Sequence, residues 1–305
     1  MAAVGVAAIG VALACVAALV PVWPIALVVH FRVQWLVIGA VIAVAAMALR
    51  ARGFAEVAAI ATLIQLVAVA PDLGAERGAI PTSGTAVRVL VLNVHTESDG
   101  FAAVRRLIER ERPDVIGLLE VDARWLAALA PALAGYAGRL EAPRSDNFGV
   151  ALYARGPLDG AIEALGGPLP AVVARVAHGA AALGVVLVHP LPPVSGAALD
   201  AQHAVLDAAA DRARALPAPA ILLGDLNTTP WAPAFARLLA RSGLCDTRAG
   251  FGLQATFPAG LALARIPIDH ILASCTAGVR DRRIGPDVGS DHLPVIADLV
   301  LPPLP

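Results

Sequence analysis

The pattern of hydrophobic and polar positions divides the chain into two parts. Before residue 71, three long apolar runs cover residues 2–20, 33–49 and 54–70. Beyond residue 85, short apolar runs alternate with amphipathic stretches. Long apolar runs are typical of helices in lipid, whereas the alternation is typical of an α/β domain. We therefore expect a membrane module over 1–70, a Pro-, Gly- and Ser-containing linker over 71–85 and a globular catalytic domain over 86–305.

The three apolar runs predict three transmembrane helices. A helix of 17 residues reaches about 26 Å, slightly less than a hydrocarbon core of about 30 Å, and flanking residues could make up the difference. A cleaved signal peptide fits residues 1–29 poorly, because no basic residue precedes the run and two further runs follow it. A channel or transporter is disfavoured, since Glu56 and Gln65 are the main polar groups within the runs.

The arginines near the apolar runs predict how the module is oriented. Arg50 and Arg52 lie between the second and third runs, whereas the loop after the first run holds Arg32. The positive-inside rule places the more basic loop in the cytoplasm. The globular domain then lies outside the cytoplasm.

The region after the linker predicts alternating strands and helices. An amphipathic pattern indicates a helix over 99–112, capped by Asp99, and a second helix over 197–216. A third helix is expected after Thr228 or Thr229, with Pro230 in its first turn. The expected strands cover 87–92, 115–119, 148–153, 171–176, 184–188, 221–223, 266–272 and 295–299.

Composition narrows the class of protein further. Hydrophobic residues make up 58% of the 305 residues, which excludes intrinsic disorder. In the region 86–305, 19 arginines face 21 acidic residues, which argues against strong non-specific binding of nucleic acid. The three cysteines show no metal-binding spacing; Cys245 and Cys275 could pair in an oxidising compartment, but their spacing leaves this open.

Polar residues recur where the expected strands end, and this pattern indicates a site. They are Asn93, Glu120, His189, Asp225, Asn227, Asp269, Asp291 and His292. Strand ends at one edge of a sheet are where α/β folds commonly build their sites. Carboxylate and amide oxygens suit Mg²⁺ or Mn²⁺ better than zinc, and histidines can donate protons to phosphoryl oxygens. A P-loop and a G-x-S-x-G elbow are absent from the sequence, which disfavours an NTPase and a serine hydrolase.

Six short motifs resemble the endonuclease/exonuclease/phosphatase (DNase I-like) superfamily. They are LNV (92–94), IGLLEV (116–121), VHP (188–190), LLGDLN (222–227), IDHIL (268–272) and SDHLPV (290–295). The resemblance covers roughly residues 86–300 and implies a four-layer α/β/β/α sandwich that hydrolyses phosphoesters with a divalent metal. Together with the membrane module, it resembles a bacterial inner-membrane subgroup.

The resemblance implies a metal site and a set of catalytic groups. Glu120 is similar to the family's main metal ligand, with Asn93 near the metal and Asp291 on the metal side. Leu119 replaces the family's Gln before this Glu, and His95 stands where some nucleases have a second acidic ligand.

The catalytic roles follow the same resemblance. Asp225 matches the residue that positions or deprotonates the attacking water, and Asn227 matches the one that holds the phosphate. His189 is similar to a histidine placed against the phosphate. His292 matches the final acid–base or oxyanion group, and Asp269 the carboxylate that pairs with it.

These observations predict a membrane-anchored phosphoesterase that uses Mg²⁺ or Mn²⁺. Its substrate is a phosphodiester or phosphomonoester, with a lipid favoured by location and nucleic acid as the alternative. A catalytically silent membrane interaction protein is a third alternative, disfavoured because all the motif residues are present. The sequence indicates the bilayer as a partner and gives no reason to expect an obligate protein partner.

Overall fold

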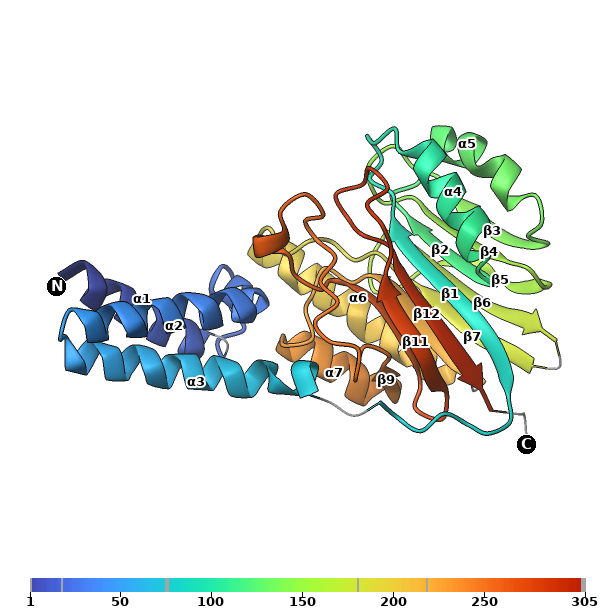
Figure 1. Cartoon of the computed structure of the whole chain (residues 1–305). Helices are drawn as coiled ribbons and strands as arrows, with labels where there is room; N and C mark the ends of the chain where they lie inside the picture. Colours follow the sequence, from blue (N-terminus) through green and yellow to red (C-terminus); the bar gives the residue numbers. More distant parts are fainter. Residues whose placement is uncertain (1, 18, 75–76, 180, 218, 303–305) are drawn as a thin grey trace.

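The computed structural model describes residues 2–17, 19–74, 77–179, 181–217 and 219–302. It consists of an elongated helical bundle joined to a sandwich of sheets and helices (Figure 1). Residues 75 and 76 of the predicted linker, and residues 303–305 of the predicted domain, lie outside the described residues.

Within the part of the chain that the structure describes, two helices of the bundle are long and apolar enough to cross a membrane. These are the segment Ile25–Ala48, formed by η1 (Ile25–Phe31) and α2 (Arg32–Ala48), and α3 (Arg52–Gly74). The first predicted run instead forms α1 (Ala2–Ala17), whose 16 residues reach about 24 Å. Of the three predicted transmembrane helices, two are therefore long and apolar enough to cross a membrane, and the first run forms a shorter apolar helix.

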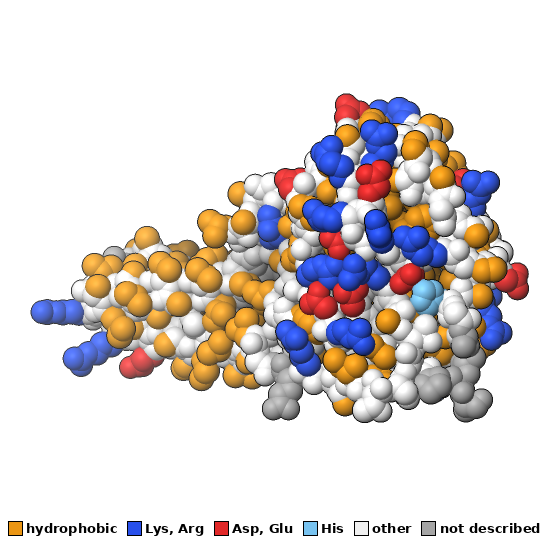
Figure 2. Space-filling model, turned by 45° about the vertical axis from the view of Figure 1, so that its right-hand side comes forward, with side chains coloured by type: hydrophobic (Ala, Val, Ile, Leu, Met, Phe, Trp, Pro, Cys, Tyr) orange, Lys and Arg blue, Asp and Glu red, His pale blue; other side chains and the backbone are white. Residues whose placement is uncertain are grey.

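The bundle carries its large apolar side chains on the outside. Val6, Val41 and Val67 are 72%, 63% and 65% exposed, and hydrophobic side chains cover the visible bundle surface in Figure 2. Its interior holds small residues such as Ala8 and Ala58. Small residues inside and large apolar residues outside are the arrangement expected of helices that face lipid.

The sandwich is built from two mixed six-stranded sheets. The first has the order β11-β12-β1-β2-β4-β3 and the second β5-β6-β7-β8-β10-β9. The first sheet consists of β1 (Thr85–Asn93), β2 (Val115–Leu119), β3 (Gly138–Ala142), β4 (Val150–Ala154), β11 (Gly278–Ile284) and β12 (Val295–Leu301). The second consists of β5 (Leu158–Ala164), β6 (Pro170–His178), β7 (Ala181–Leu187), β8 (Ala220–Asp225), β9 (Leu244–Asp246) and β10 (Asp269–Ser274).

Helices cover the outer face of each sheet. α4 (Phe101–Glu111) and α5 (Ala123–Leu133) pack on the first sheet through the cluster around Trp125, which is fully buried. α6 (Gly196–Ala215) and α7 (Pro233–Ser242) pack on the second through Phe235 and its neighbours. The facing sides of the two sheets form the central core. The α/β/β/α layering predicted from the resemblance is thus consistent with the two mixed sheets observed.

Several local predictions differ from the structure. Asp99 does not cap α4, since the N-cap position is held by Gly100. The helix expected at Pro230 begins at Pro233, because the intervening residues form a turn in which Ala232 N–H donates to Thr229. Strand β5 escaped prediction because it is an edge strand whose residues are largely exposed, so its apolar pattern is weak.

The polar strand ends meet at one edge of the sandwich. Asn93 ends β1, which runs parallel to β2 just before Glu120. Asp225 ends β8 and pairs directly with Asp269 at the start of the antiparallel β10. The bundle packs against loops at this same edge, where His30 contacts Thr229 (Figure 1).

Candidate active site

Asn93 links the two sheets at the centre of the site. Its side chain is fully buried, and its Nδ2 donates to Glu120 Oε1 at 2.8 Å and to Asp225 Oδ2 at 3.2 Å. Its amide oxygen accepts the backbone N–H of His95 at 3.0 Å. Asn93 therefore holds one carboxylate from each sheet at a fixed separation.

Glu120 is held by its backbone as well as by its side chain. Its φ of 59° is left-handed, a conformation that non-glycine residues adopt at a cost when the surroundings enforce it. Thr96 supplies that constraint: its backbone N–H donates to Glu120 Oε2 at 3.3 Å and its hydroxyl to the Glu120 carbonyl at 2.9 Å. The strained turn aims the carboxylate at the sheet edge.

Asp225 lies at the centre of the buried polar cluster. Its Oδ1 accepts the backbone N–H of Asn227 at 2.9 Å, and its Oδ2 lies 3.5 Å from His189 Nε2 and 3.6 Å from His292 Nε2. The preceding Gly224 has a φ of 151°, and a Cβ there would lie 1.9 Å from the Val188 carbonyl oxygen. Only glycine lets the chain approach Val188 so closely and still present Asp225.

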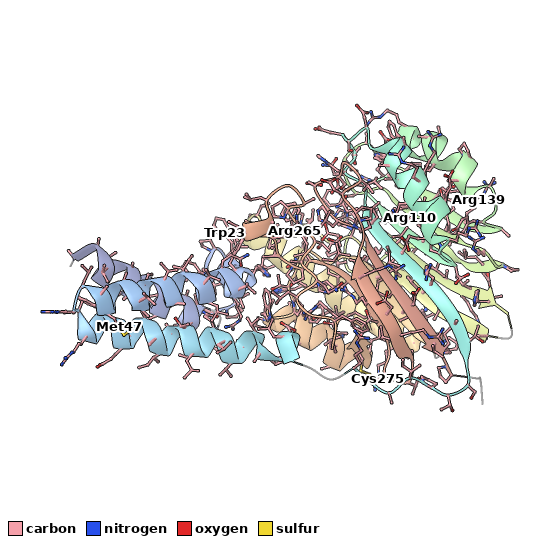
Figure 3. The ribbon with its side chains drawn as sticks, viewed as in Figure 1. Trp23, Met47, Arg110, Arg139, Arg265 and Cys275 are labelled. Carbon is pink, nitrogen blue, oxygen red and sulfur yellow. A yellow bond between two sulfur atoms is a disulfide. The ribbon has the colours of Figure 1, made fainter. Side chains whose placement is uncertain are left out.

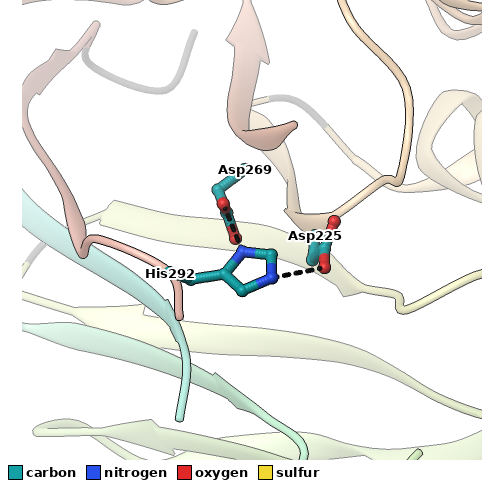
Figure 4. Close-up of side chains that lie close together, drawn as sticks. All are labelled: Asp225, Asp269 and His292. Carbon is teal, nitrogen blue, oxygen red and sulfur yellow. Dashed lines mark hydrogen bonds and ion pairs between the residues drawn. The ribbon is translucent and has the colours of Figure 1, made fainter. Parts of the chain in front are cut away.

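Asp269 and His292 form a buried pair next to Asp225. His292 Nδ1 lies 2.8 Å from Asp269 Oδ2, so the imidazole bridges two carboxylates (Figure 4). The Phe257 ring covers the imidazole at a centroid distance of 4.7 Å. The hydrogen bond to Asp269 fixes the ring so that Nε2 faces Asp225.

Burial of His292 and the negative charge of its neighbours shift the pKa of its imidazole in opposite directions. Burial by itself lowers its pKa, but the carboxylates of Asp269 and Asp225 outweigh that effect and raise the pKa to about 10. Burial likewise opposes the charge on Asp225, yet His292 and His189 hold the pKa of Asp225 below its usual range. For Asp269, burial dominates and raises the pKa. His292 is therefore protonated at neutral pH and Asp225 is ionised.

Asn227 and His189 sit beside Asp225. The Asn227 side-chain amide donates to the Pro190 carbonyl at 3.1 Å, and its backbone carbonyl accepts from Gln202 Nε2 at 2.7 Å. His189 is 5% exposed, and its ring lies 5.3 Å from that of Phe148. Both residues lie in the same cluster as Asp225, as the sequence predicted.

Asp291 lies at the outer rim of the cluster. Its side chain is 44% exposed, and its Oδ1 lies 3.7 Å from His95 Nδ1. The neighbouring Ser290 ties this turn to β1, because its hydroxyl donates to the Asn93 carbonyl at 2.7 Å and accepts the His292 N–H. Asp291 is therefore connected to the cluster through Ser290 and His95.

The donor set fits a hard divalent cation. The side-chain ligand atoms of Asp225, Asp269 and His292 lie within 4.8 Å of one another, but the proton on His292 leaves the two carboxylates as the oxygen donors. Glu120 adds a partly exposed carboxylate, which Asn93 holds in place. Among the described residues, arginine pairs with none of Glu120, Asp225 and Asp291. Carboxylates that no arginine neutralises suit Mg²⁺ or Mn²⁺.

Sequence reasoning missed several residues that support the site. Thr96 and Ser290 hold Glu120 and His292, and Gln202 holds the Asn227 backbone. Ser290 belongs to a motif that was recognised, so its role could have been anticipated. Gln202 lies on α6, far away in sequence, and nothing in the local pattern distinguishes it from other polar helix residues.

Two mixed sheets between helices, with carboxylate, amide and imidazole groups at one edge, define a DNase I-like hydrolase sandwich. Residues 90–292 match the endonuclease/exonuclease/phosphatase family. The chain belongs to this family. No curated protein matches it.

Solved structures share the fold. An endonuclease/exonuclease/phosphatase from Beutenbergia cavernae DSM 12333 is 25% identical, with a TM-score of 0.55 over 71% of this chain and 72% of that one. TDP2 from D. rerio in complex with a single-strand DNA product is 17% identical, with a TM-score of 0.60 over 70% of this chain and 99% of that one. Sphingomyelinase C from Streptomyces griseocarneus is 18% identical, with a TM-score of 0.51 over 70% of this chain and 99% of that one.

Proposed function

We propose that this protein is a membrane-anchored, Mg²⁺- or Mn²⁺-dependent phosphoesterase that hydrolyses its substrate by in-line attack of water. One observation supports this most strongly: Asn93 bridges Glu120 of the first sheet and Asp225 of the second, beside the Asp269–His292 pair. Several neighbouring carboxylates without arginine partners would destabilise a purely structural cluster, because their charges repel one another. Phosphoryl transfer uses such carboxylates to hold the metal and to orient water.

The residues around Asp225 supply the proposed chemistry. Asp225 is ionised, buried and fixed by the Asn227 N–H, so it orients the water and accepts its proton. The imidazole of His292, which Asp269 holds in place, is protonated. It donates a hydrogen bond to the phosphoryl oxygens as negative charge develops on them. His189 and the Asn227 amide contribute further donors on the same side.

The proposed metal site lies at Glu120. Glu120 and Asp291 would hold the ion, and Asn93 belongs to the site as the group that fixes the Glu120 carboxylate. When bound, the cation offsets negative charge on the phosphoryl oxygens and polarises the phosphorus for attack. The constrained backbone of Glu120 keeps its carboxylate in place without a rearrangement on binding.

The proposed location is a bacterial plasma membrane, with the catalytic domain outside the cytoplasm. Arg50 lies between α2 and α3, and Arg52 is the first residue of α3, at the end of the bundle away from the sandwich. Positive loops favour the cytoplasmic side. Cys245 and Cys275, whose pairing the sequence left open, form a disulfide in the structure, and disulfides persist mainly outside the cytoplasm.

Nucleic acid is the second candidate substrate, because structural neighbours include TDP2 solved with a DNA product. The excess of acidic over basic residues in 86–305 weighs against it, because backbone binding relies on a basic surface. Basic and acidic side chains are interspersed on the sandwich face visible in Figure 2.

The test is hydrolysis of bis-p-nitrophenyl phosphate by the full chain in detergent, with Mg²⁺ or Mn²⁺ and with EDTA. We expect turnover that depends on the metal and is abolished by Asp225→Ala, which should still fold. Asp200→Ala, an exposed aspartate on α6, is the matched control. Hydrolysis by Asp225→Ala near the wild-type rate would refute the proposal, and plasmid DNA cleavage in a parallel assay would favour the nuclease.

A further inference from the structure

An apolar groove lies where the bundle meets the catalytic domain. It has a volume of about 430 Å³ and runs between the first turns of α2 and the loop over 253–267, which contains η2 (Ala262–Ala264). Gln34 Nε2 donates to the carbonyl oxygens of Leu263 and Arg265, each at 3.2 Å, and so holds the loop against the helix. The walls include Val33, Val37, Ile38, Trp231, Leu263 and Pro267.

The outer end of the groove carries large apolar side chains on an open surface. Leu263 is 91% exposed and Leu261 58% exposed, and on the helix side Val37 is 57% exposed. Figure 3 places Arg265 and Trp23 at the sandwich end of the bundle and Met47 at the opposite end. Exposed leucines beside a membrane helix, with tryptophan and arginine at the same end, are the pattern of a membrane–water interface.

The loops that line the groove also carry residues of the active site. Pro267 lies two residues before Asp269, and Ala255 two residues before Phe257, whose ring covers His292. Trp231 follows Asn227 in the same loop. The groove therefore lies between the first turns of α2 and loops that also carry residues of the active site.

We propose that this groove binds one acyl chain of a bilayer phospholipid whose phosphoester enters the active site. The inference rests on the proposed function and names its substrate class. The occupant is an acyl chain because the groove is apolar and α2 continues from it directly into the apolar surface of the bundle. Arg265, the charged residue of the lining, donates to the carbonyl oxygens of Pro258 and Ala259 and thereby fixes the loop.

Trp231 in the groove wall provides a test that needs no turnover. In a Trp23→Phe/Trp35→Phe background the remaining tryptophans are Trp231 and the fully buried Trp125. The full chain is placed in phosphatidylcholine vesicles whose acyl chains carry bromine, which quenches tryptophan on contact. We expect quenching of Trp231, and loss of most of it in Ala255→Phe, which fills the groove. The matched control is Ala130→Phe on the exposed side of α5.

A second measurement separates a lipid headgroup from a free phosphate. Hydrolysis of bis-p-nitrophenyl phosphate is measured with phosphatidic acid in phosphatidylcholine vesicles and with glycerol 3-phosphate. We expect inhibition by phosphatidic acid at a concentration that rises about tenfold in Ala255→Phe, the effect of excluding about two methylene groups. Glycerol 3-phosphate should inhibit far more weakly and equally in both proteins.

The outcomes distinguish the two proposals. Unquenched Trp231, quenching that persists in Ala255→Phe, or equal inhibition by both phosphates would overturn the lipid groove. Absence of any bis-p-nitrophenyl phosphate hydrolysis by the wild type would instead overturn the proposed function, while the quenching result would still stand.

Discussion

The helical bundle and the sandwich place their apolar residues in opposite positions. In the bundle, Val6 and Val41 are exposed, and the polar Gln65 is 1% exposed, with its side chain hydrogen-bonded to Arg32. In the sandwich, Val91 and Leu223 are fully buried. Each arrangement lowers the free energy in a different solvent, lipid for the bundle and water for the sandwich. The contrast is the one expected if the bundle anchors the sandwich to a membrane, as proposed above.

The two regions meet through buried polar contacts. Arg248 is 3% exposed and pairs with Asp72 at the end of α3 at 2.7 Å, and Trp231 Nε1 donates to the same carboxylate at 2.6 Å. His30 Nδ1 lies 3.0 Å from the Thr229 hydroxyl, in the loop that follows Asn227. The bundle is therefore joined to the active-site edge by specific contacts as well as by the linker.

The largest expected effect concerns the buried polar cluster of the sandwich. His292→Asn should lower kcat by about 10³-fold, because the donor that stabilises the developing charge is lost. The rate is measured with bis-p-nitrophenyl phosphate and excess Mg²⁺. His178→Asn is the control, since His178 is half-buried and contacts the Ala86 backbone carbonyl outside the site. A loss below tenfold would mean that the cluster is structural, like Gln65 in the bundle.

Removing the disulfide of the sandwich should have the next largest effect, a loss of stability. Cys245 and Cys275 close a loop of 30 residues, and removing such a crosslink typically costs about 2–4 kcal/mol. Chemical unfolding of the full chain in detergent, with and without reductant, measures the difference. A Cys245→Ser/Cys275→Ser variant should unfold like the reduced wild type. Equal stability of the oxidised and reduced proteins would remove this support for a location outside the cytoplasm.

The junction between the two regions is expected to have a smaller effect. Asp72→Asn should lower the free energy of unfolding by about 1–3 kcal/mol, because Arg248 loses a buried partner while keeping Asp246 at 3.2 Å. Asp211→Asn removes an exposed ion pair with Arg241 and should cost under about 1 kcal/mol. If Asp72→Asn and Asp211→Asn lower the free energy of unfolding equally, the bundle and the sandwich are coupled by the linker alone.

The last prediction concerns the pH dependence of stability in the metal-free protein. Because the pKa of His292 is raised to about 10 from 6.5, its stabilising contribution is complete below pH 6.5 and declines as the pH rises towards 10. The thermal stability of the wild type and of His292→Gln in EDTA should therefore converge over this range. If the difference in thermal stability between the wild type and His292→Gln instead increased with rising pH, the charge assigned to His292 would be wrong.

Much of the fold and of the candidate site could be predicted from sequence. Buried strands such as β2 and β8 contain continuous apolar runs, so their limits were predicted closely. The residues at strand ends, such as Asn93 and Asp225, were grouped correctly because strand ends share an edge. Strand β11 was missed because four of its seven residues form the charged run RDRR, in which Arg283 pairs with Asp281 and with Asp298 of the neighbouring β12.

The contacts between bundle and sandwich could not be predicted. His30, a single histidine after the first apolar run, is buried against Thr229. Asp72 was assigned to the linker, although α3 continues through Pro71 to Gly74 and carries Asp72 to Arg248. These contacts join positions over 150 residues apart, and neither local periodicity nor motif spacing encodes such distances.

The most direct test of the central claim measures hydrolysis of bis-p-nitrophenyl phosphate against Mg²⁺ concentration for the wild type and Glu120→Gln. If Glu120 holds the cation beside Asp225, the wild type has no turnover in EDTA and saturates with Mg²⁺. Glu120→Gln then requires at least about 10–100-fold more Mg²⁺, the range found for weakened metal sites. Turnover of the wild type in EDTA, or the same Mg²⁺ dependence in both proteins, would contradict the account.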